Sequence, residues 1–359
     1  MDLCVGCKGC KRDCPTGVDM ARMKIEFTAQ YKKRHGHSAK DRLLAALPQH
    51  VHRGGMLGPL VRWRNRTGLL RRAGERWLGL AARRSLPAFR RDTFWRNPER
   101  AALLTADEAL AAQRAGDKVA VLFVDTFNGG FETENTLAAL KVLRAGGYTV
   151  HVAQKAGGHL CCGRPLLAAG MADEAKAKAA ELLAALRPFA ERGIAIVGLE
   201  PSCLLSMRDE MTVMGLGDAA ATLAAQALLF EEFLAREAKA GRFAPALRPT
   251  TKPMRVHGHC HQKAFGAMPP VLDVLRLIPG AKPELIESSC CGMAGSFGYE
   301  AEHHAVSMQM AELSLLPALR AAPADAVVVA DGTSCRHQIA DGAGRQALHV
   351  ARVLADHLA

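Results

Sequence analysis

The sequence repeats itself with a period of about 130 residues, and this repeat constrains the fold more than any other feature. Three features recur in the same order: an apolar run, a Cys-Cys-Gly motif after it, and a later cysteine. The matched positions are Cys161 and Cys290, Cys203 and Cys335, and Val119 and Pro253, with shifts of 129, 132 and about 134 residues. A period of this size indicates two copies of one domain that face each other.

Each copy alternates short apolar or β-branched runs with Ala/Leu-rich helical stretches. The first copy reads "VAVLFVD", "YTVHVA" and "IAIVGLE" at its expected strands, and the second reads "MRVHG", "PELIES" and "DAVVVAD". Successive β-α-β units build mostly parallel sheets covered by helices. The sequence therefore predicts an α/β fold, with Cys-Cys-Gly domains at 116–250 and 251–359.

The chain begins with a cysteine run of the form C-x2-C-x2-C-x3-C-P, typical of bacterial ferredoxins. Its thiols are Cys4, Cys7, Cys10 and Cys14. In such runs the first three thiolates bind one iron–sulfur cluster and the fourth usually reaches a second cluster. Apolar residues at helical spacing follow, so residues 1–47 are expected to form a short helical ferredoxin-like unit that binds an iron–sulfur cluster. A structural zinc knuckle is the alternative.

Four cysteines of the second copy are expected to converge. Each follows a predicted strand, and the carboxyl ends of parallel strands share one edge of the sheet. They are Cys260, Cys290, Cys291 and Cys335. Four thiolates suit an iron–sulfur cluster or a tetrahedral zinc ion. Three histidines, His257, His259 and His261, flank Cys260. They are open to roles as metal ligands, as hydrogen-bond donors to the site or as proton carriers, or they form only local hydrogen bonds.

The first copy has only three of these cysteines, Cys161, Cys162 and Cys203. No thiol stands near Phe127 or Asn128, where the counterpart of Cys260 is expected. The three thiols could bind metal with help from Glu200 or His159, or they could be the remnant of a site.

The positive charge is concentrated in one segment. The chain of 359 residues has a formal net charge of +12, and residues 53–100 hold thirteen arginines against three acidic residues, with all three tryptophans. We interpret 48–115 as a basic connector that docks on a partner, contacts an anionic membrane surface, or only links domains. No recognition motif for nucleic acid accompanies it.

The longest apolar stretch, 219–230, is too short to span a bilayer. The N-terminus lacks a secretory signal pattern. A cytoplasmic location is therefore expected, with contact at the inner face of the membrane as an option.

The cysteine motifs together resemble a known family. "HGHCHQKAFG", "ESSCCGMAGSFGYE" and "ADGTSCRHQIADG" are similar to the C-terminal iron–sulfur half of FAD-linked D-2-hydroxyacid dehydrogenases, of the D-lactate or D-2-hydroxyglutarate type. They also resemble the iron–sulfur subunits of glycolate oxidase and anaerobic glycerol-3-phosphate dehydrogenase, and the cysteine-rich subunit of heterodisulfide reductase. The family pattern ends in C-x-x-C, but Glu200 and Gly332 stand at its first cysteine, which argues against a five-thiolate cluster.

The resemblance implies electron transfer. A flavin would oxidise the hydroxyacid, and clusters would pass electrons to quinone or another acceptor, with Cys4, Cys7 and Cys10 on a 4Fe-4S cluster and Cys14 serving its neighbour. The chain has no dinucleotide-binding glycine motif, so FAD is expected on an upstream domain or a partner, and Met1 is expected to be an internal position of a larger enzyme. The alternatives are a zinc-stabilised scaffold and a thiol/disulfide redox module.

Overall fold

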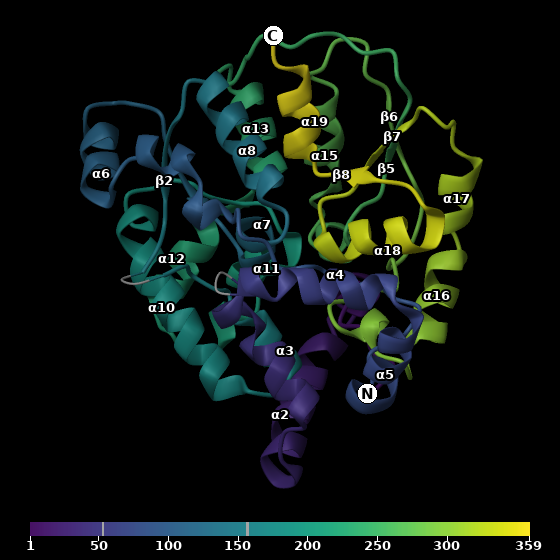
Figure 1. Ribbon diagram of the computed structural model, residues 1–359. Helices are drawn as coiled ribbons and strands as arrows, with labels where there is room; N and C mark the ends of the chain where they lie inside the picture. The colour runs from purple at the N-terminus through teal and green to yellow at the C-terminus, as the bar shows by residue number, and fades with distance from the viewer. Residues whose placement is uncertain (52–53, 156–157) are drawn as a thin grey trace.

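The computed structural model describes residues 1–51, 54–155 and 158–359 and contains two parallel four-stranded sheets (Figure 1). The first sheet has the order β2-β1-β3-β4, with β1 at Val119–Phe123, β2 at Thr149–Val152, β3 at Ile196–Gly198 and β4 at Ala227–Leu229. The second has the order β6-β5-β7-β8, with β5 at Met254–Val256, β6 at Pro283–Leu285, β7 at Val327–Val329 and β8 at Ala347–Leu348. The identical strand order confirms the predicted fold of repeated α/β domains.

Helices connect consecutive strands, as parallel pairing requires. In the first repeat they are α7 (Thr126–Gly130), α8 (Thr133–Ala145), α9 (Arg164–Ala168), α10 (Ala172–Ala190), α11 (Pro201–Arg208), α12 (Asp218–Gln226) and α13 (Phe230–Lys239). In the second they are α14 (Cys260–Ala264), α15 (Met268–Leu275), α16 (His304–Glu312), α17 (Leu315–Ala321), α18 (Thr333–Ala343) and α19 (Val350–His357). Over the described ranges, no helix is both long and apolar enough to cross a membrane.

The two repeats pack through equivalent helices. α8 packs on α19, and α13 packs on α15, side by side in Figure 1. Because α8 corresponds to α15 and α13 to α19, these two interfaces are related by a pseudo-twofold axis. One hydrophobic core runs through both sheets and includes Leu122, Val256 and Val350, all at most 1% exposed. Burial of this shared apolar surface holds the repeats in one body.

The N-terminal part lies across both repeats. It contains α1 (Gly9–Asp13), α2 (Met20–His35) and α3 (Ala39–His50), and the connector adds 3-10 turns at Gly54–Met56, Phe94–Arg96 and Pro98–Ala102, with α4 (Gly58–Arg66), α5 (Gly68–Leu78) and α6 (Ala106–Arg114). Phe94 is fully buried in the shared core, so the connector is packed against the first repeat. Arg53, counted in the basic segment, lies outside the described residues. The domain boundaries stay predictions, and α3 continues across the one expected at residue 47.

Candidate metal centres

The structure brings the four predicted thiols of the second repeat together, and we name this group the closed site. Cys260 is the first residue of α14, Cys335 lies in the first turn of α18, and the Cys-Cys pair lies in the loop after β6. The side chains contact one another in the order Cys260, Cys290, Cys291, Cys335. Four neighbouring thiols at the carboxyl edge of the sheet fit the thiolate ligands of an iron–sulfur cluster or of zinc.

The glycine after the Cys-Cys pair is required by the shape of the loop. Gly292 has a φ of +83°, and a Cβ on it would lie 2.2 Å from the Ser307 carbonyl oxygen. Its N–H points at the Cys290 Sγ at 3.4 Å. Gly163 repeats this arrangement in the first repeat, with a φ of +80° and its N–H 3.4 Å from the Cys161 Sγ. Glycine has no Cβ and adopts a positive φ readily, so the left-handed backbone and the close neighbours explain why a glycine follows each Cys-Cys pair.

Positive charge faces the closed site. The Lys263 ammonium donates hydrogen bonds to the carbonyl oxygens of Ser288 and Ser289, at 2.5 and 2.8 Å. Burial lowers the pKa of Lys263, and the four thiols act in the opposite direction on it. A cation held by backbone carbonyls at this place stabilises a negatively charged group bound to the thiolates.

Of the three flanking histidines, His257 is the one that groups with two of the thiols at ligand distance. Its Nδ1 lies 2.9 Å from the Ser288 hydroxyl, and a ring nitrogen, Cys291 Sγ and Cys335 Sγ lie within 4.8 Å of one another. The buried Nε2 has no hydrogen-bond partner in the described parts of the chain. His257 is therefore placed to ligate a metal or to donate a hydrogen bond to a sulfur atom.

The other two histidines support the neighbouring structure. The Nδ1 of His259 accepts a hydrogen bond from the His261 N–H at 3.1 Å and so caps α14. Burial lowers the pKa of His259 to about 3, which keeps it neutral. The Nε2 of His261 lies 3.0 Å from the Gly6 carbonyl oxygen and 3.2 Å from the Arg164 guanidinium, so this side chain links the N-terminal run to both repeats.

The three thiols of the first repeat also meet, and we name them the open site. Cys161, Cys162 and Cys203 contact one another in that order. α7 begins at Thr126 as α14 begins at Cys260, each after a side-chain cap, so Thr126 occupies the place of the missing cysteine. The Thr126 side chain hydrogen-bonds to Cys161. Cys161 is partly exposed, whereas the other two thiols are buried.

The two side chains proposed to complete the open site are engaged elsewhere. One Glu200 oxygen accepts the Thr333 N–H at 2.9 Å and the other accepts the Ser202 hydroxyl at 2.9 Å, so Glu200 caps α18 of the opposite repeat. The His159 Nε2 donates to the Pro48 carbonyl oxygen at 2.6 Å. The open site thus keeps three thiols and the Thr126 hydroxyl.

The N-terminal run lies directly against the closed site. Burial raises the pKa of Cys7, and the nearby thiols of Cys260, Cys10 and Cys4 raise it further. Cys14 is separate: its Sγ pairs with the Thr16 hydroxyl at 3.1 Å, an interaction that lowers its pKa. The described contacts group Cys4, Cys7 and Cys10 and leave the fourth thiol apart.

A buried ion-pair cluster fixes the run in this position. Lys8, between two of the cysteines, is 1% exposed and lies 2.5 Å from Asp209 and 3.1 Å from Glu210. Burial opposes its charge, but the carboxylates of Glu210 and Asp209 raise the pKa of Lys8 overall. Arg164, which follows the first Cys-Cys-Gly, also binds Glu210, at 2.6 Å. Lys8 and Arg164 were not predicted as site residues from the sequence, although both lie within cysteine motifs.

Comparison with known proteins identifies relatives of both repeats. A family model described as a cysteine-rich domain, CCG, matches residues 126–208 and 255–340. One subunit of the anaerobic glycerol-3-phosphate dehydrogenase of Escherichia coli is 30% identical over 288 residues, which are 77% of this chain and 66% of that polypeptide. D-2-hydroxyglutarate dehydrogenases of Escherichia coli and Pseudomonas putida are 24% and 26% identical over 99% and 98% of this chain.

The chain spans just under two thirds of the glycerol-3-phosphate dehydrogenase polypeptide and about a third of the D-2-hydroxyglutarate dehydrogenases. The matched CCG regions contain all seven thiols of the open and closed sites. The resemblance seen in the cysteine motifs is confirmed: both repeats match the family model of the cysteine-rich CCG domain, and the chain as a whole is similar to components of these dehydrogenases.

Proposed function

We propose that this chain is the iron–sulfur electron-transfer module of an FAD-dependent D-2-hydroxyacid dehydrogenase. The N-terminal cysteines would hold a 4Fe-4S cluster and the closed site a second iron–sulfur cluster, while FAD would be bound by another domain or subunit. Iron–sulfur clusters supply one-electron carriers whose potentials depend on charge and hydrogen bonds around the sulfur atoms. The similarity to dehydrogenases supports an electron-transfer role, and the choice of a hydroxyacid is the finer part of the proposal.

The observation that carries the proposal is the contact between the N-terminal run and the closed site. Cys7 is near enough to Cys260 for each thiol to influence the other's charge. Lys8 and the Gly6 carbonyl hold this contact through Glu210 and His261. A metal that only stabilised one domain would not require the two cysteine groups to adjoin, whereas stepwise electron transfer does.

The separate position of Cys14 supports a partner that brings further ligands. Its thiol interacts with the Thr16 hydroxyl and with the backbone of Thr16, Gly17 and Val18, and not with another thiol among the described contacts. In two-cluster ferredoxins the fourth cysteine ligates the other cluster. We therefore assign Cys14 to a cluster shared with the flavin-bearing domain or subunit.

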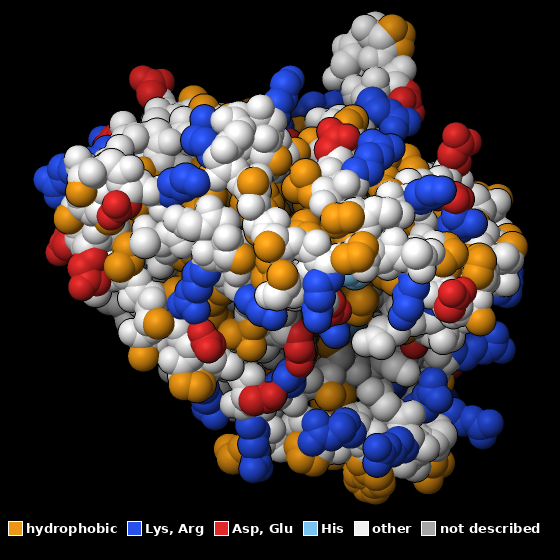
Figure 2. All heavy atoms as spheres, turned by 90° about the horizontal axis from the view of Figure 1, so that it is seen from above, with side chains coloured by type: hydrophobic (Ala, Val, Ile, Leu, Met, Phe, Trp, Pro, Cys, Tyr) orange, Lys and Arg blue, Asp and Glu red, His pale blue; other side chains and the backbone are white. Residues whose placement is uncertain are grey.

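The basic connector offers a surface for that partner. On α4 and α5, Trp63, Leu69 and Trp77 are 58%, 77% and 82% exposed, beside the arginines of the same helices. The face that is seen from above in Figure 2 also carries basic and hydrophobic side chains that are interspersed. We assign the α4–α5 surface to the flavoprotein, with a cytoplasmic location. Binding to anionic vesicles instead of the flavoprotein would assign the surface to the membrane.

The proposal is tested by anaerobic purification followed by iron, sulfide and zinc analysis. Iron with acid-labile sulfide in two or more clusters per chain is the expected result. Zinc without sulfide would overturn it in favour of a zinc-stabilised scaffold. Clusters that are reduced when the flavoprotein oxidises D-lactate or D-2-hydroxyglutarate would identify the donor, and reduction only by glycerol 3-phosphate would overturn the hydroxyacid assignment.

A further inference from the structure

One nitrogen atom of the closed site is buried without a partner. The His257 side chain is 1% exposed, and over residues 1–51, 54–155 and 158–359 its Nε2 finds no hydrogen-bond partner. A ring nitrogen of His257, Cys291 Sγ and Cys335 Sγ lie within 4.8 Å of one another. Because burying an unpaired polar atom costs free energy, this position indicates that Nε2 binds a group at the thiols.

The hydrogen bonds around Ser288 determine which nitrogen of His257 carries a proton. The Ser288 hydroxyl donates to the Ile286 carbonyl oxygen at 3.4 Å, and its oxygen accepts from the Lys263 ammonium at 3.3 Å. The remaining lone pair of that oxygen faces the His257 Nδ1 at 2.9 Å, so Nδ1 is the donor. A buried imidazole beside an ammonium group is neutral, and Nε2 therefore has a lone pair and no proton.

This arrangement is typical of a metal-binding histidine. Such a histidine binds the metal through one ring nitrogen and donates the proton of the other to a protein group, which fixes the ring. On one tetrahedral ion the bound nitrogen and sulfur atoms lie about 3.5–3.8 Å apart, given metal–ligand bonds of about 2.0–2.3 Å. Three atoms within 4.8 Å of one another are close to that geometry. A hydrogen bond from Nε2 to a thiolate would instead require a proton on Nε2.

The His259 ring closes another side of the site. Gly332 directly precedes α18, and a Cβ on it would lie 2.4 Å from the His259 Cδ2 and 3.3 Å from the Cys335 Sγ. A side chain at Gly332 would therefore displace His259, whose Nδ1 accepts the His261 N–H at the start of α14. The fold thus keeps position 332 free of a ligand and places the imidazole of His257 beside Cys335.

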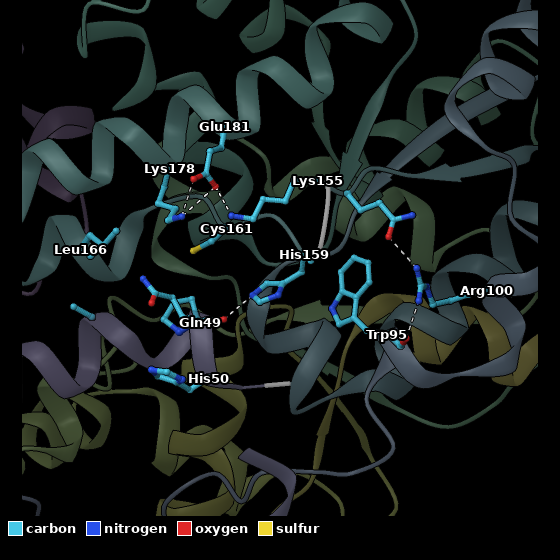
Figure 3. Close-up of a pocket in the computed structure, with 14 residues that line it drawn as sticks. Gln49, His50, Trp95, Arg100, Lys155, His159, Cys161, Leu166, Lys178 and Glu181 are labelled. Carbon is cyan, nitrogen blue, oxygen red and sulfur yellow. Dashed lines mark hydrogen bonds and ion pairs between the residues drawn. The ribbon is translucent and has the colours of Figure 1, made fainter. Parts of the chain in front are cut away.

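In the open site an apolar residue stands at the place of this imidazole. Phe123 lies three residues before α7, as His257 lies three residues before α14, and it is 1% exposed in the apolar core. Cys161 lines a cavity of about 940 Å³, where the neighbouring His159 donates to the Pro48 carbonyl oxygen at 2.6 Å (Figure 3). The imidazole at the thiols therefore accompanies the repeat that has four of them.

We propose that the His257 Nε2 is a ligand of the metal group in the closed site, on the side of Cys291 and Cys335. The group is then bound by four thiolates and one imidazole. This rests on the proposed function for the nature of the group, an iron–sulfur cluster. Because an imidazole is neutral and a thiolate is negative, the imidazole raises the reduction potential relative to a thiolate in its place, which makes the closed site a better electron acceptor.

The test is pulsed EPR of the reduced, iron-loaded protein that contains isotopically labelled histidine. We expect the strong nitrogen coupling of a metal-bound imidazole. His257→Cys should keep iron and sulfide, lose this coupling and have a lower reduction potential, because a thiolate replaces the imidazole. His259→Asn is the matched control: it removes the adjacent imidazole, and asparagine still caps a helix start, so the coupling should remain.

The iron and sulfide contents of the same samples test the proposed function separately. Iron-loaded protein without a strong nitrogen coupling, or with one that persists in His257→Cys or disappears in His259→Asn, overturns the imidazole ligand. Loss of the iron in His257→Cys also counts against it, since a thiolate should replace an imidazole as ligand. Zinc without sulfide contradicts the proposed function, and X-ray absorption at the zinc edge then tests the ligand.

Imidazole scattering that His257→Cys removes would support the ligand in that case, whereas an all-sulfur zinc site in the wild type would overturn it. Protein that binds no metal overturns both the proposed function and the ligand.

Discussion

The two repeats have the same strand order and the same Cys-Cys-Gly turn, yet their sites differ. The closed site has four contacting thiols, whereas the open site has three and the Thr126 hydroxyl. The difference arises at the first residue of one short helix, which is Cys260 in α14 and Thr126 in α7. A single side chain at an equivalent helix start thus changes the number of thiols that the site offers.

The two sites also differ in what surrounds their thiols. The closed site is covered by the N-terminal run through Cys7 and Gly6, and Lys263 faces its thiols. The open site instead faces a cavity at Cys161. The following predictions test this contrast between a site that adjoins the N-terminal run and a site that faces a cavity.

The largest effect is expected from removing a thiol of the closed site. Cys335→Ser should lose the metal bound there, because a cluster needs each of its thiolates and the buried hydroxyl is a poor substitute. Metal and sulfide analysis of the anaerobic protein measures this loss. Cys203→Ser is the matched change in the open site, and the same loss of iron in both variants would contradict the distinction between the sites.

The reverse substitution should give the open site a fourth thiol. Thr126→Cys places a thiol at the start of α7, next to Cys161, in the position that Cys260 has in α14. We expect the variant to bind additional iron or zinc per chain, measured by metal analysis after reconstitution. An unchanged metal content would show that more than this one side chain separates the two sites.

The next effect concerns the ion pairs that hold the N-terminal run. Lys8→Met removes the one buried cation that pairs with Asp209 and Glu210, although Asp209 keeps its partly exposed partners Arg22 and Lys11. We expect a loss of about 3 kcal/mol in the free energy of unfolding. Lys11 also binds Asp209, at 3.0 Å, but its side chain is 36% exposed, so Lys11→Met should cost about 1 kcal/mol or less. Urea denaturation compares the two variants, and equal losses would argue against a buried anchor at Lys8.

The smallest effect is a pH-dependent contact between the repeats. Glu132 of the first repeat accepts a hydrogen bond from Arg336 of the second at 2.8 Å. Burial opposes its ionisation, but Arg336 outweighs this and lowers the pKa of Glu132 from 4.5 to about 2. The stabilisation is therefore complete above pH 4.5 and is lost as the pH falls toward 2.

Glu132→Gln isolates this contribution. The difference in unfolding free energy between wild type and variant should be smaller at about pH 3.5 than at about pH 7 by about 1.4 kcal/mol. Denaturation curves at the two pH values measure it. A difference that stays constant or grows with acidification would show that Glu132 is not ionised by Arg336.

The sequence was sufficient to predict the repeat, the parallel sheets and the convergence of Cys260, Cys290, Cys291 and Cys335, because strand ends and cysteine spacing are local signals. It placed the missing thiol near Phe127 or Asn128, whereas helix alignment identifies Thr126, since a helix start is defined only to within a residue or two by pattern. The roles of Lys8, Arg164 and Glu200 depend on contacts between distant segments. No local pattern encodes those contacts.

The most direct test of the central claim is EPR spectroscopy of the anaerobically reduced protein. If the N-terminal run and the closed site both hold iron–sulfur clusters, their adjacency predicts a spectrum broadened or split by interaction between two paramagnetic centres. Cys335→Ser should convert it to the simple signal of one isolated cluster. A reduced wild-type protein with no iron signal, or with signals that never interact, would contradict the account.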